Sequence, residues 1–88
     1  MKCFHIRIFG DVHGVGFRYA AQRKAKELGL VGFVRNAADG SVYIEAQGNE
    51  SELQHFIAWC AKGPPYARVE RVWQEQTAVG NYDDFHID

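Results

Sequence analysis

The chain of 88 residues is poor in cysteine, and its two cysteines exclude several kinds of site. Cys3 and Cys60 form no CxxC pair and lack metal-ligand spacing, which excludes a cysteine-based zinc centre and a CxxC redox centre. We expect two buried, reduced thiols in a cytoplasmic protein. A single Cys3–Cys60 disulfide is the alternative, because the sequence does not give the Cα–Cα distance that such a bond requires.

An excess of charge of one sign is also absent. Ten Lys and Arg residues against eleven Asp and Glu residues give a formal net charge of −1. Broad binding to nucleic acids or to anionic membranes requires clustered cations, so we expect neither as a partner. No apolar run reaches the length of a membrane span. Residues 1–8 interleave Lys2, His5 and Arg7 with apolar residues, which indicates a strand and not a signal peptide. Because the net charge is only −1, any anion site must be confined to a small group of residues.

The fingerprints of common nucleotide and metal sites are missing as well. No Lys-Ser or Lys-Thr pair follows the glycines as a P-loop requires, and Gly14–Gly16 lacks the third glycine of the dinucleotide pattern. There is no GxSxG elbow, HExxH pair, calcium loop or evident acid/base pair of carboxylates. The four histidines have no ligand spacing: His5, His13, His55 and His86. We therefore expect no metal ion and no cofactor.

What the chain does contain is apolar residues at regular spacing. Hydrophobic residues make up 47% of the sequence and aromatic residues 14%, enough for the core of one domain over residues 1–88. Alternation predicts strands at about residues 3–9, 31–36, 42–47, 66–77 and 85–87. Helical spacing predicts helices over residues 17–28 and between residues 50 and 62.

Turn and cap residues agree with these elements. Ala37–Gly40 predicts a hairpin turn, and Asn49 with Glu52 predicts a capping box at the start of the second helix. A bulge near Arg71 explains the interrupted alternation of the fourth strand. The order βαββαβ, with a short extra C-terminal strand, predicts an α+β fold. The expected form is a ferredoxin-like sandwich, an antiparallel sheet with two helices on one face.

The most informative stretch is Gly10–Arg18, which joins the first strand to the first helix. It contains three glycines, which allow positive φ and close approach of a ligand to the backbone. Unpaired N–H groups at a helix start, with the helix dipole beneath them, form an anion site. Arg18 adds a permanent positive charge and a planar fork that can bind two phosphoryl oxygens. On this stretch alone, a tight connection with its arginine in water is an equal alternative.

A second stretch, Gly32–Val42, completes a resemblance that covers essentially the whole chain. With Gly10–Arg18, it closely resembles the two signatures of the acylphosphatase family, G-x-V-Q-G-V-x-F-R and G-F-V-[KR]-N-x-x-x-G-x-V with a later glycine, here Gly48. One departure is visible, because His13 stands where the family usually has glutamine. A phosphate contact through the backbone N–H at this position survives the change, whereas a side-chain role there is in doubt.

The resemblance implies an enzyme that hydrolyses the carboxyl-phosphate bond of acyl phosphates. Arg18 and loop N–H groups would hold the phosphoryl group, and Asn36 would position the attacking water. The residues implied in phosphate binding are His13, Gly14, Val15, Gly16, Phe17 and Arg18. The leaving carboxylate has a conjugate acid with a pKa of about 4, so it departs without a general acid. Inorganic phosphate or sulfate should compete with the substrate, and we expect a monomer.

A non-enzymatic module is the alternative reading. RNA-recognition modules share the βαββαβ order, and Gly32–Val34 faintly resembles their aromatic sheet motif. That motif requires a basic residue before its glycine, where this chain has Val31. A regulatory anion-binding domain that has lost turnover is a third reading, against which the presence of both Arg18 and Asn36 argues.

Overall fold

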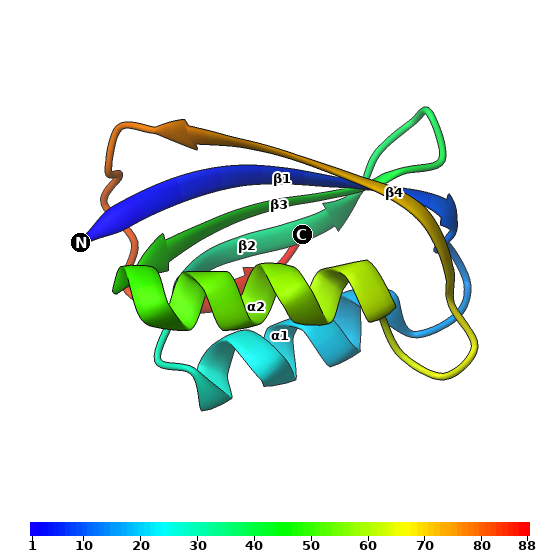
Figure 1. The fold of residues 1–88 in the computed structure, drawn as a ribbon, viewed down its shortest axis with the longest axis horizontal. Helices are drawn as coiled ribbons and strands as arrows, with labels where there is room; N and C mark the ends of the chain where they lie inside the picture. The colour runs from blue at the N-terminus through cyan, green and yellow to red at the C-terminus, as the bar shows by residue number, and fades with distance from the viewer.

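The computed structural model describes residues 1–88 as one five-stranded sheet with two helices. The elements are β1 (Lys2–Asp11), α1 (Phe17–Glu27), β2 (Val31–Asn36), β3 (Val42–Gly48), α2 (Glu50–Lys62), β4 (Arg68–Thr77) and β5 (Phe85–Ile87). The strand order is β4-β1-β3-β2-β5, and both helices lie on the same face of the sheet (Figure 1). The predicted ferredoxin-like arrangement is confirmed. Neither helix is long and apolar enough to cross a membrane.

Strand register explains which side chains form the core. Ile6 pairs with Ile44, Ile44 pairs with Val34, and all three side chains are fully buried. The apolar faces of both helices pack against this row, as the spacing predicts. The buried helix residues are Phe17, Ala21 and Ala25 of α1, and Leu53, Phe56, Ile57 and Cys60 of α2.

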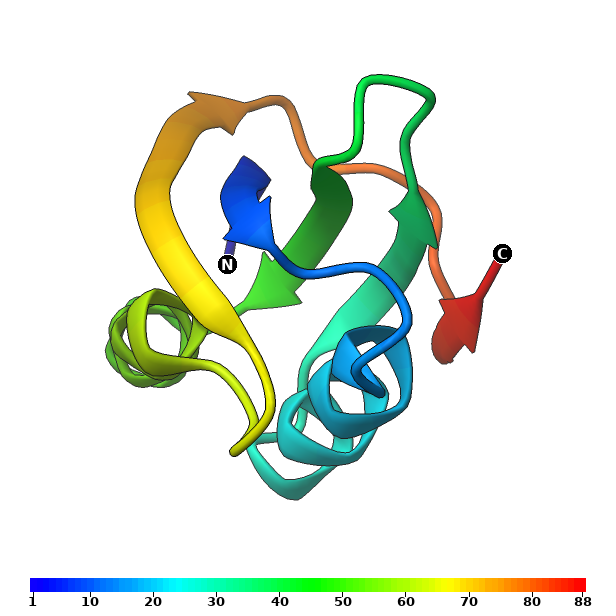
Figure 2. The ribbon, with the colours of Figure 1, turned by 90° about the vertical axis from the view of Figure 1, so that its right-hand side faces the viewer.

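The topology brings two separate segments to one edge of the sheet. β3 is antiparallel to both β1 and β2, so β1 and β2 run in the same direction and end at the same edge. The β1–α1 loop and the end of β2 therefore lie together, although β3 separates their strands. Figure 2 shows this edge, with the blue loop crossing from β1 to the start of α1.

Cys3 and Cys60 are free and buried, and burial raises the pKa of both thiols. The expected bulge is present, because Phe9 pairs with Arg71 whereas Gly10 pairs with Val69. β4 begins at Arg68, two residues later than expected, because the turn after α2 extends to that point.

Two features differ from the sequence prediction or refine it. Asn49 occupies the N-cap position of α2, but its side chain makes no capping hydrogen bond, so the predicted capping box is wrong. This helix start is exposed, and acidic Glu50 and Glu52 in the first turn complement the helix dipole instead. The short strand β5 pairs parallel to β2, whereas all other strand pairs are antiparallel.

Candidate active site

The loop between β1 and α1 turns through two left-handed glycines. Gly14 has φ +70° and Gly16, the N-cap of α1, has φ +78°. A Cβ atom at either position would meet no other atom within 4 Å, so these glycines are required by conformation and not by crowding. The loop therefore keeps an open space in front of its backbone.

The backbone N–H groups of this loop have no hydrogen-bond acceptors within the protein. None of the N–H groups of residues 13–19 donates a hydrogen bond to another backbone group, and the first donor bonded across the helix start is that of Ala20, to Gly16. No side chain caps the start of α1, and its first turn contains no acidic residue. Free N–H groups at a helix N-terminus, without a competing anion, form a site for an anionic ligand.

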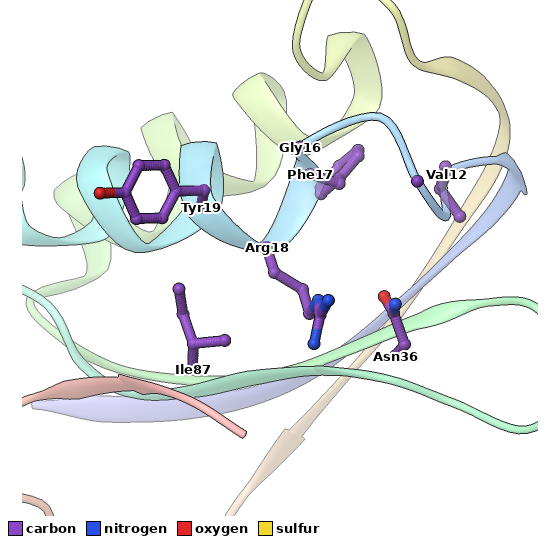
Figure 3. A pocket seen from close by; sticks show the side chains of 8 residues that line it. Val12, Gly16, Phe17, Arg18, Tyr19, Asn36 and Ile87 are labelled. Atoms are coloured by element: carbon purple, nitrogen blue, oxygen red, sulfur yellow. The ribbon is translucent and has the colours of Figure 1, made fainter.

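Arg18 supplies the side-chain charge at this site. Its Nη1 donates a long hydrogen bond, 3.5 Å, to the backbone oxygen of Asp88, and the guanidinium forms no ion pair with a carboxylate. The side chain extends from α1 toward the sheet (Figure 3). Its remaining donors are available to a phosphoryl group.

Asn36 is the last residue of β2, and the following hairpin holds its backbone in place. The N–H of Ala37 donates to the carbonyl of Ser41 at 2.8 Å. Asp39 accepts hydrogen bonds from the Ser41 hydroxyl at 2.5 Å and from the Ser41 N–H at 2.9 Å. These two donors, the hydroxyl first, hold the pKa of Asp39 below its ordinary value. The turn that follows Asn36 is thus fixed by hydrogen bonds within itself.

His13 connects the glycine loop to that hairpin. Its Nε2 lies 2.8 Å from the carbonyl oxygen of Ser41, the oxygen that also accepts from Ala37. A carbonyl oxygen can only accept, so the imidazole donates from Nε2. The side chain that departs from the family pattern therefore joins the loop to the segment that carries Asn36.

A cavity of about 220 Å³ lies between these segments. Five of the residues expected from the sequence line it: Gly14, Gly16, Phe17, Arg18 and Asn36. His13 and Val15, which were also expected to bind phosphate, do not line it. In Figure 3, Asn36 and Ile87 lie on opposite sides of the Arg18 guanidinium.

Three lining residues were not expected from the sequence, namely Val12, Tyr19 and Ile87. Tyr19 follows Arg18 in the first turn of α1, so its position next to the site could have been inferred from the helix assignment. Ile87 reaches the cavity because β5 pairs with β2, with Ile87 opposite Val34. No local pattern indicates that pairing.

The structure contains no cluster of three or more His, Cys, Asp or Glu side chains that could bind a metal ion. His5 lies against Glu45 at 3.1 Å, whereas His55 and His86 are exposed. The polar groups of the cavity lining are the backbone of the glycine loop, the Arg18 guanidinium, the Asn36 amide and the Tyr19 hydroxyl.

Comparison with known proteins gives one consistent result. The family model for acylphosphatase matches residues 4–87. A curated relative from Thermotoga petrophila, named acylphosphatase, is 51% identical over 87 residues, which cover 99% of this chain and 97% of the relative. The solved acylphosphatase from Bacillus subtilis is 35% identical, with a TM-score of 0.97 over 100% of this chain and 99% of that one. The acylphosphatase structure from Coxiella burnetii is 37% identical, with a TM-score of 0.96 over 99% of this chain and 92% of that one.

Proposed function

The chain belongs to the acylphosphatase family, and we propose that it performs the family's hydrolysis of acyl phosphates with the 13–18 loop, Arg18 and Asn36. Its reaction converts an acyl phosphate and water into a carboxylate and inorganic phosphate. The family match extends over nearly the whole chain and supports this activity. No observation favours the non-enzymatic binding module.

One observation carries the assignment of residues. A single cavity brings together a guanidinium with no ion pair, the amide of Asn36 and a loop whose N–H groups have no partners within the protein. Donors of this kind bind a phosphoryl dianion without reorganising, because their geometry is fixed before the substrate arrives. Arg18 and the loop accordingly hold the three non-bridging oxygens.

Asn36 acts on the attacking water. An amide has both donor and acceptor atoms, so it can orient a water toward phosphorus but cannot deprotonate it. The water oxygen bonds to phosphorus while the bond from phosphorus to the acyl oxygen breaks, and the carboxylate leaves with that electron pair. One water proton moves to a phosphate oxygen of the substrate, and the other remains on the product as P–OH.

Positioning and charge stabilisation are sufficient for this chemistry. Phosphoryl transfer commonly passes through a loose transition state, and a carboxylate leaves without protonation. Neither a general acid nor a metal ion is required. We accordingly expect turnover of acetyl phosphate and benzoyl phosphate in the presence of a chelator.

The test separates binding from rate in three variants, with phosphate release and calorimetric binding of inorganic phosphate both measured in excess EDTA. Arg18→Ala should lose most activity and most phosphate affinity, and Arg18→Lys should restore little, because an ammonium lacks the planar fork. Asn36→Ala should lower kcat about a hundredfold or more and leave phosphate affinity nearly unchanged.

Three results would contradict the proposal. If Arg18→Ala retains wild-type phosphate affinity and rate, the anion site lies elsewhere. If Asn36→Ala lowers only the thermal midpoint and leaves kcat per folded molecule intact, Asn36 is a turn residue. Inhibition by EDTA that a divalent ion reverses would contradict the metal-free mechanism. Competition by inorganic phosphate against substrate is expected in the wild-type protein.

A further inference from the structure

The two ends of the cavity differ in chemistry. At one end lies Asn36, whose amide offers polar groups to a phosphoryl ligand (Figure 3). At the other end lie Tyr19 and Ile87, whose residues are 74% and 36% exposed. The Arg18 guanidinium lies between the two ends (Figure 3). An exposed aromatic ring and an exposed branched side chain thus adjoin the anion site.

The geometry of phosphoryl transfer gives these two ends different roles. The attacking and leaving oxygens lie roughly in line on opposite sides of phosphorus. With the water at Asn36, the leaving carboxyl oxygen points away from Asn36. In Figure 3 that direction leads past Arg18 toward Tyr19 and Ile87. The acyl group of a substrate bound in this way would extend over these two side chains.

Given the proposed phosphoryl site, on which this assignment rests, we propose that Tyr19 and Ile87 form the subsite for the acyl group. The subsite favours acyl phosphates whose acyl group is aromatic or branched and apolar over acetyl phosphate. Apolar area removed from water and ring stacking on Tyr19 supply the preference.

Both side chains are held by ordered backbone. Tyr19 belongs to the first turn of α1, directly after Arg18. Ile87 pairs with Val34 across β5 and β2, and the N–H of Asp88 donates to the carbonyl of Val34 at 2.9 Å. The bond from Arg18 to the Asp88 oxygen also joins this strand to α1. A subsite whose backbone is ordered before binding loses less entropy when the substrate is bound.

The experiment compares kcat/KM for benzoyl phosphate and acetyl phosphate in the wild type, Tyr19→Ser and Ile87→Ser. The benzoyl-to-acetyl ratio is the readout, because the intrinsic reactivity of each substrate cancels between variants. Tyr19→Ser should lower this ratio about threefold to tenfold, and Ile87→Ser about twofold to fivefold.

The chain provides matched controls that do not line the cavity. Tyr66, in the turn before β4, is 85% exposed, and Val79, after β4, is 56% exposed. Tyr66→Ser and Val79→Ser remove similar apolar area without touching the cavity, so the ratio should stay at the wild-type value.

A second measurement tests the subsite without requiring turnover. It is calorimetric binding of two non-hydrolysable analogues, benzoylphosphonate and acetylphosphonate. Benzoylphosphonate should bind more tightly to the wild type, and Tyr19→Ser should remove most of the difference. Equal losses for both substrates, or an unchanged ratio in both variants, would overturn the subsite while acyl phosphate hydrolysis stands. Tighter binding of benzoylphosphonate without any turnover would support the subsite and contradict the proposed function.

Discussion

At the scale of single residues, His13 has a role that its place in the family pattern does not indicate. Its Nε2 donates to the Ser41 carbonyl and thereby ties the glycine loop to the hairpin behind Asn36. This nitrogen carries a proton in that hydrogen bond and cannot take one from the attacking water. A glutamine amide could donate to the same carbonyl, so the departure from the family residue preserves a donor at this position.

We predict that His13→Gln retains activity within about twofold of the wild type, because the tether is kept. His13→Leu should lower kcat about fivefold, the effect of one net hydrogen bond. Steady-state kinetics on acetyl phosphate checks both values, with thermal midpoints to establish folding. A loss of several orders of magnitude in His13→Gln, with the fold intact, would instead make His13 a general base.

The Asp39 carboxylate gives a prediction for acid stability. Its folded-state pKa is lowered by the two Ser41 donors, so its contribution to stability is present above the unfolded pKa of about 3.9 and is lost as pH falls through the folded value. The urea midpoint of the wild type should therefore fall more steeply below about pH 4 than that of Asp39→Asn. Asp83→Asn, at an exposed aspartate without a side-chain hydrogen bond, is the control and should retain the wild-type slope. Parallel pH profiles for the wild type and Asp39→Asn would contradict the assignment.

At the scale of elements, the bulge between β1 and β4 directs the chain into the site. Gly10 lies at the register shift with φ +134°, and a Cβ there would collide with the carbonyl oxygen of Arg68 and approach the Glu70 nitrogen at 2.9 Å. β1 therefore leaves the sheet through a contact between two backbones that only glycine allows. The two residues that follow, Asp11 and Val12, lead into the glycine loop.

We predict that Gly10→Ala lowers the free energy of unfolding by about 3–5 kcal/mol, from backbone strain and overpacking together. Gly40→Ala is the matched comparison, because Gly40 has φ +91° and open space around its Cβ position. It should cost only the strain, about 1–2 kcal/mol. Urea denaturation measures both values. Equal losses of unfolding free energy in the two variants would show that the close contact with β4 does not contribute to the effect of Gly10→Ala.

At the scale of the whole molecule, the short strand β5 joins the site to the core. Phe85 is fully buried, and its ring centroid lies 6.1 Å from that of Phe56 on α2. The same strand contributes Ile87 to the cavity and leads to Asp88, whose backbone oxygen accepts from Arg18. Through this strand of three residues, packing in the core fixes the position of one wall of the cavity.

We predict that Phe85→Ala lowers the free energy of unfolding by about 3–5 kcal/mol, as expected for loss of a fully buried phenylalanine. It should also increase hydrogen exchange at two N–H groups that join β2 to the segment around β5: that of Gly32, which donates to the Asp84 carbonyl, and that of Asp88, which donates to the Val34 carbonyl. His86→Ala, on the exposed side of the same strand, should change stability by less than about 0.5 kcal/mol. Unchanged exchange at both amides in Phe85→Ala would mean that β5 does not depend on this anchor.

The sequence by itself determined the elements, their order, the glycine loop, and the identity of Arg18 and Asn36 as candidate site residues. The elements, their order and the glycine loop follow from apolar periodicity and from the conformational range of glycine, which act over a few residues, whereas Asn36 was indicated only by the resemblance to the family signature. Local preference failed at Asn49, where an available capping side chain makes no bond at an exposed helix start. The tertiary structure alone brought Asn36, Arg18 and Ile87 together around one cavity and placed His13 against Ser41. Those contacts depend on strand register and on the parallel pairing of β5 with β2. Both are set by burial of the whole core, so no local sequence pattern predicts them.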